Sequence, residues 1–121
     1  MTTTLTICIT CKRNGETEAA PDGRPAGARL ADAVAAAAGN RSEAPRIVRH
    51  ECLWACAEGC AILIEAAGKT GYVAGRFEPT AAAANAILDW CAAHAASPAG
   101  TVRYGLWPEG MKGHFIARIP A

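Results

Sequence analysis

The chain has 121 residues, a formal net charge of +1 and a composition that is 51% hydrophobic but only 6% aromatic. Its length suits one domain with a modest core, and the near-neutral charge argues against nucleic acid or an acidic membrane as a partner. The first residues lack the features of a secretory signal, and no run of about 18 apolar residues could span a membrane. We therefore expect a cytoplasmic protein.

The first predicted element is a strand over residues 4–9, where β-branched and polar residues alternate. Cys8 lies at the end of this strand, and Cys11 follows just beyond it. Residues 12–27 are rich in glycine, proline and charge, which predicts a long loop.

A helix is predicted from about residue 26 to residue 38, with Leu30 and Val34 on one face and a Gly-Asn stop directly after it. Residues 46–50 form the next predicted strand. Because a strand, a helix and a strand follow in this order, we expect the two strands to pair in parallel.

Residues 61–65 and 70–74 flank a Gly-Lys turn, which predicts a β-hairpin. A long helix is predicted over residues 79–96, with Pro79 in its first position. The tail is expected to be ordered but mostly irregular, with a short strand at 113–119. The residues predicted to line the apolar face of the long helix are Ala84, Ile87, Leu88, Cys91 and Ala95.

These elements predict an α/β domain that spans residues 1–121. We expect a small mixed sheet in the order β-α-β-β-β-α, with the helices packed on it and an irregular C-terminal extension. No internal repeat and no second domain are apparent.

Six cysteines in a chain without an export signal indicate metal binding or thiol redox chemistry. Five of them form two groups, Cys8-x-x-Cys11 and Cys52-x-x-x-Cys56-x-x-x-Cys60. In a parallel sheet, the end of the first strand and the loop after the second lie at the same edge, so the two groups can converge. Four thiolates in two pairs suit either a tetrahedral zinc or a 2Fe-2S cluster.

Several other residues have less specific interpretations. Cys91 is expected in the core. His50 precedes the second cysteine group and could ligate the metal or donate a hydrogen bond to a cysteine sulfur, although a structural or solvated role is favoured. His94 and His114 lack metal-type spacing and are interpreted as incidental. A basic rim around the centre could include Lys12, Arg13, Arg46 and Arg49.

The chain resembles the thioredoxin-like 2Fe-2S ferredoxins in its strand ending in Cys8, its helix and second strand, and the run from Cys52 to Gly59 that leads into an apolar strand. It resembles more closely a bacterial family of predicted metal-binding proteins related to those ferredoxins. The motifs shared with that family are Cys8-x-x-Cys11, Glu51-Cys52-Leu53, Cys60, Tyr72-Val73 with Gly75, Trp107-Pro108-Glu109-Gly110 and Ala117-Arg118-Ile119-Pro120.

The resemblance implies a thioredoxin-like ferredoxin fold, a 2Fe-2S cluster and a redox partner protein, and it allows a homodimer. The ferredoxins place one ligand near the start of the first helix, where this chain has Gly27 and Ala28. Either Cys11 or Cys60 is therefore expected as the fourth ligand.

We expect an electron-transfer or redox accessory protein and not an enzyme, because no catalytic triad pattern, phosphate-binding loop or acid–base pair of carboxylates is recognisable. The expected ligands are Cys8, Cys11, Cys52 and Cys56, with Cys60 as the alternative. Two other functions stay open. One is a zinc- or cobalt-binding protein, structural or metal-delivering, that uses the same thiolates. The other is a dithiol redox protein that uses Cys8 and Cys11.

Overall fold

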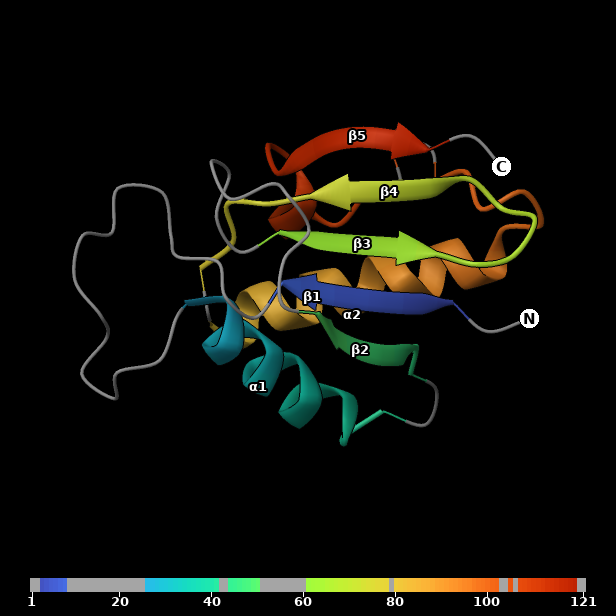
Figure 1. Ribbon diagram of the computed structural model, residues 1–121. Helices are drawn as coiled ribbons and strands as arrows, with labels where there is room; N and C mark the ends of the chain where they lie inside the picture. The colour runs from blue at the N-terminus through green and yellow to red at the C-terminus, as the bar shows by residue number, and fades with distance from the viewer. Residues whose placement is uncertain are drawn as a thin grey trace.

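The computed structural model describes residues 3–8, 26–41, 44–50, 61–78, 80–102, 105 and 107–119. Figure 1 shows a sheet with helices packed against it. The elements are β1 (Thr4–Cys8), α1 (Ala26–Ala38), β2 (Arg46–His50), β3 (Ile62–Glu65), β4 (Gly71–Ala74), α2 (Ala81–Ala96), the 3-10 helix η2 (Glu109–Met111) and β5 (Phe115–Ile119).

The sheet has five strands in the order β2-β1-β3-β4-β5. Strands β1 and β2 are parallel, and every other neighbouring pair is antiparallel. The predicted α/β class, the mixed sheet, the parallel pairing across α1 and the β3–β4 hairpin are therefore confirmed.

The core lies on one face of the sheet, and both helices contribute to it. Alternation along β1 directs Leu5 and Ile7 into this core, where both are fully buried. The helix α2 runs behind the sheet in Figure 1. The remaining large aliphatic members of the core are Leu30 and Val34 of α1, Ile62 and Ile64 of β3, and Ile87 and Leu88 of α2.

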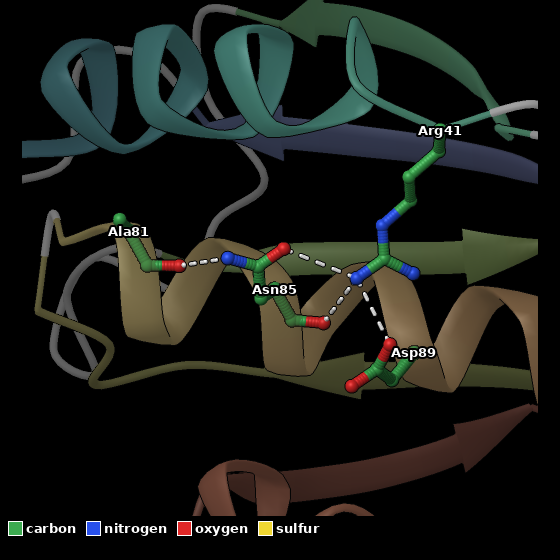
Figure 2. Close-up of polar contacts among 4 residues, drawn as sticks. All are labelled: Arg41, Ala81, Asn85 and Asp89. Atoms are coloured by element: carbon green, nitrogen blue, oxygen red, sulfur yellow. Dashed lines mark hydrogen bonds and ion pairs between the residues drawn. The ribbon is translucent and has the colours of Figure 1, made fainter.

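The chain just after α1 contacts α2 through polar groups at the surface (Figure 2). Arg41, three residues after α1, places one guanidinium nitrogen 2.9 Å from Oδ1 of Asp89 in α2. The same nitrogen donates hydrogen bonds to Oδ1 of Asn85 at 3.1 Å and to its carbonyl oxygen at 3.2 Å. The side-chain amide of Asn85 in turn donates to the carbonyl of Ala81 at 3.0 Å, so the chain after α1 is attached to α2.

The start of α2 differs from the prediction. Thr80 is the N-cap, and its hydroxyl accepts a hydrogen bond from the backbone N–H of Ala83 at 3.2 Å. The helix therefore begins at Ala81, because a threonine side chain can satisfy an N–H group at the helix end. Pro79, the predicted first position, lies outside the described residues.

The buried face of α2 is also wider than predicted. Ala95 is exposed, whereas Trp90 and His94 are buried. The ring of Trp90 meets Tyr72 edge-on at 5.1 Å and Trp107 at 4.4 Å, so aromatic side chains from both the sheet and the tail bury the far side of this helix.

The predicted order of elements ended with the long helix, but the C-terminal region adds the helix η2 and the strand β5. β5 pairs with β4, which confirms the short strand expected within 113–119, although over fewer residues. A register irregularity between Val73 and Ala74 places Phe115 beside Ala74. The ring of Phe115 meets Tyr72 at 6.3 Å and Trp107 at 5.6 Å, which ties the tail to the core.

His94 is a structural residue, so its interpretation as incidental is wrong. It is fully buried, with Nδ1 2.9 Å from the hydroxyl of Thr3 and Nε2 2.7 Å from the carbonyl oxygen of Thr70. A carbonyl only accepts, so Nε2 carries the proton and Nδ1 accepts from Thr3. Gly100 packs so closely that an added Cβ would lie 2.9 Å from Nε2 of His94.

Within the described ranges, the longest helix is α2, with 16 residues. None of these helices combines the length and the apolar character that crossing a membrane would require.

Candidate metal centre

Cys8 is the last residue of β1 and has no exposed surface. Its backbone N–H donates to the carbonyl of Ala61 at 3.0 Å, and its partner in the β1–β2 register is His50. Because Ile7 points into the core, alternation places the Cys8 side chain on the opposite face of the sheet. This thiol is fully buried but is not a member of the main hydrophobic cluster between the sheet and the helices.

Both ends of the second cysteine segment are attached beside Cys8. His50 and Ala61 are the residues on either side of 51–60 in the sequence, and they flank Cys8 on its two neighbouring sides in the sheet. In the sequence, Cys52 is two residues after His50, and Cys60 directly precedes Ala61. The ends of β1 and β2 therefore lie side by side, as predicted, while the convergence of the two cysteine groups stays a prediction.

The remaining predicted ligands, Cys11, Cys52, Cys56 and Cys60, lie outside the described residues. The ligand set as a whole therefore stays a prediction. In the part of the chain that the structure describes, no group of three or more His, Cys, Asp and Glu side chains could hold a metal.

Cys91 contrasts with Cys8 in its surroundings. It is buried within the core on α2, as predicted, and neither of these two cysteines is in a disulfide. Burial raises the pKa of the Cys91 thiol to about 12, and the nearby charge of Arg41 opposes this rise. A thiol that holds its proton so strongly is a poor nucleophile and a poor metal ligand, so Cys91 has a packing role.

The described part of the predicted basic rim does not assemble around Cys8. Arg46 pairs with Thr4, at the far end of β1. Arg49 forms an ion pair with Asp32 of α1 at 3.0 Å, which places its guanidinium on the helix-covered face. By strand alternation the Arg46 side chain shares the face of Cys8 but lies at the opposite end of the strands, whereas the Arg49 side chain is on the other face. Lys12 and Arg13 lie outside the described residues.

His50 lies beside Cys8, a position that the sequence analysis did not predict. It is exposed and occupies the register position beside Cys8 at the end of two parallel strands. The sequence alone did not reveal this neighbour: the predicted strands were 4–9 and 46–50, and only the observed register pairs Cys8 with His50. The other two histidines serve structure, since His94 bonds Thr3 and His114 lies 2.9 Å from the carbonyl of Gly75.

Of the predicted ligands, Cys8 is the one that the structure describes, and its thiol could supply one ligand to a soft metal or an iron–sulfur cluster. A buried thiolate needs a compensating positive charge, which a bound metal supplies. Cys8 lies on a central strand whose neighbours on both sides are fixed by ladder hydrogen bonds. The strand ends on either side of the second cysteine group in the sequence are thus held in place by the sheet itself.

Comparison with known protein families matches residues 5–121 to a family described as "Protein of unknown function (DUF1636)". Since the match extends over nearly the whole chain, the protein belongs to this family. The comparisons with curated proteins and with solved structures gave no match. The findings thus establish membership of a family without an assigned function, and they provide no link to the thioredoxin-like ferredoxins.

Proposed function

We propose that this member of the DUF1636 family is a small 2Fe-2S protein that serves in electron transfer or as a redox accessory. The proposed ligands are Cys8, Cys11, Cys52 and Cys56, with Cys60 as the alternative to Cys11. The observation that supports the proposal is the position of Cys8. It is buried at the C-terminal end of the central strand β1, between His50 and Ala61, which flank the second cysteine segment in the sequence.

The chain's own residues would act mainly by positioning and by excluding water. The hydrogen bond from the backbone N–H of Cys8 to the carbonyl of Ala61 holds the backbone of Cys8 in place at the end of β1. A cluster bound there would accept and donate single electrons, at a potential set by its ligands, burial and hydrogen bonds. The helices cover the other face, so the strands beneath the centre have a rigid support.

The proposal includes a partner and a compartment. An electron carrier needs a protein that delivers or accepts the electron, and we propose such a redox partner. Clustered cysteines stay available as metal ligands where the compartment keeps thiols reduced, so we propose that the protein is cytoplasmic. A homodimer, a thioredoxin-like ferredoxin fold and a non-enzymatic role remain parts of the same proposal.

Anaerobic purification followed by a visible spectrum and assays for metal and sulfide tests the function. We expect a brown protein with about two iron atoms and two acid-labile sulfides per chain. A colourless protein with about one zinc or cobalt would instead support the structural or metal-delivery alternative. A metal-free protein that cycles between thiols and a disulfide would support the dithiol alternative.

Serine substitutions then identify the fourth ligand. Cys11→Ser and Cys60→Ser are compared with Cys91→Ala, a control in the core away from Cys8. If Cys11 is the fourth ligand, Cys11→Ser abolishes the cluster, whereas Cys91→Ala keeps it. Loss of the cluster in Cys60→Ser alone would assign the fourth position to Cys60.

A further inference from the structure

The last register pair of the two parallel strands joins a thiol to an imidazole. Cys8 and His50 are partners at the ends of β1 and β2. Partners in a parallel pair lie about 4.8 Å apart and direct their side chains to the same face. A sulfur and a nitrogen bound to one metal at about 2.3 Å and 2.0 Å lie about 3.5 Å apart, which such neighbours can reach.

A second observation establishes the face on which His50 lies. The guanidinium of Arg49 reaches Asp32 of α1, so Arg49 lies on the helix-covered face. Alternation then places His50 on the opposite face, where Cys8 also lies because Ile7 points into the core. The imidazole is exposed while the thiol is buried, so His50 stands at the solvent side of the same site.

We propose that His50 is a ligand of the same metal centre as Cys8, which then has a mixed set of thiolate and imidazole ligands. The inference rests on the proposed function and changes one of its ligands: His50 takes the fourth position, which the proposed function gives to Cys11 or Cys60, so Cys11→Ser and Cys60→Ser should then both keep the centre. Imidazole suits iron and zinc. A neutral imidazole in place of a thiolate makes the centre less negative, which raises the reduction potential of an iron–sulfur cluster.

The other two histidines of the chain do not compete for this role. His94 uses Nδ1 and Nε2 in hydrogen bonds with Thr3 and Thr70. His114 has Nδ1 bound to the carbonyl of Gly75, and its ring stacks on Phe77 at 4.4 Å. Both therefore have structural positions away from the β1–β2 edge.

The test compares four proteins purified anaerobically and reconstituted with iron and sulfide: the wild type, His50→Ala, His50→Cys and the control Arg49→Ala. Arg49 is the neighbour of His50 on the same edge strand but faces α1. We expect pulsed EPR of the reduced wild type to show a strongly coupled nitrogen. His50→Ala should lose this coupling and bind metal at least about tenfold more weakly in competition with a chelator.

The two remaining variants separate ligation from strand stability. His50→Cys should retain the centre without the nitrogen coupling, because a thiolate can replace the imidazole. Arg49→Ala should match the wild type. If the protein holds zinc, the same comparison uses Co²⁺ in its place, and His50→Ala should shift the visible bands of the bound cobalt.

Three results would overturn the inference. A wild-type centre that shows no nitrogen coupling and is unchanged in His50→Ala would refute it and leave the proposed function intact. Equal metal losses in His50→Ala and Arg49→Ala would assign the effect to strand β2. A wild-type protein that binds neither iron, zinc nor cobalt would refute the inference together with the proposed function.

Discussion

A histidine lies beside each end of β1, and the two histidines have opposite surroundings. At its start, Thr3 bonds to a histidine, His94, which is fully buried and hydrogen-bonded through both ring nitrogens. At its end, Cys8 is beside another histidine, His50, which is exposed. The first histidine joins elements distant in the sequence, whereas the second lies where the cysteine segment leaves the sheet. A buried histidine whose two ring nitrogens are both hydrogen-bonded within the protein therefore indicates a structural role, even though it lies near a strand end.

The largest expected effect is the loss of the metal centre in Cys8→Ser. A serine hydroxyl is a poor ligand for soft metals, so metal content should fall to near zero. Circular dichroism should show a retained fold, because Cys8 is outside the core cluster. Metal analysis beside Cys91→Ala, which should keep its metal, provides the comparison. A metal-loaded Cys8→Ser protein would exclude Cys8 as a ligand.

His94→Ala should cause the largest loss of stability. It removes the bonds to Thr3 and Thr70 and leaves a cavity in a fully buried position. We expect a loss of about 3 kcal/mol in the free energy of unfolding, measured by urea denaturation. The matched variant His114→Ala removes a half-buried ring and should cost less. Equal losses in the two variants would contradict the proposed importance of the buried histidine.

Acidification should weaken the same end of β1. Burial lowers the pKa of His94 from its ordinary value of 6.5; the bond to Thr70 opposes this shift, and the charge of Lys69 adds to it. Below pH 6.5 the unfolded chain therefore binds a proton that the folded protein resists. Stability should fall by up to about 1.4 kcal/mol per pH unit until the folded state is also protonated.

Denaturation curves between pH 7.5 and pH 5 would measure this dependence. In His94→Ala the contribution of this side chain should disappear, so the slope should be shallower than in the wild type. An unchanged slope would mean that other groups are responsible.

The smallest effect is expected at the surface contact between the chain after α1 and α2. Arg41→Ala removes the ion pair with Asp89 and the hydrogen bonds to Asn85. Because the carboxylate is largely exposed, the loss should be about 1 kcal/mol or less, and added salt should reduce it. A double-mutant cycle with Asp89→Ala would measure the pair directly. A coupling well above this value would show that the contact is shielded from solvent.

The local pattern of the chain predicted most of the fold. Alternation in 4–9 and the stop after residue 38 were sufficient to predict β1, α1 and the parallel partner β2. The boundaries were less predictable, since Thr80 rather than Pro79 determines where α2 begins. β5 was harder still, because its pairing with β4 depends on contacts made across the chain and not on its own periodicity.

The site was predictable only in part. Cys8 was identified from its spacing, and the structure places it between His50 and Ala61, the residues that flank the second cysteine segment in the sequence. The role of His94 could not be predicted, because its partner Thr3 is 91 positions away. The position of His50 required the register of two strands, which spacing of cysteines alone does not reveal.

The late position of β5 has a consequence for the newly synthesised chain. Until residues 115–119 emerge from the ribosome, β4 has an unpaired edge, and the ring of Tyr72 lacks its neighbour Phe115. An open edge next to exposed aromatic surface favours association with other chains. This protein should therefore depend on chaperones, or aggregate, during the interval between the synthesis of β4 and the docking of β5.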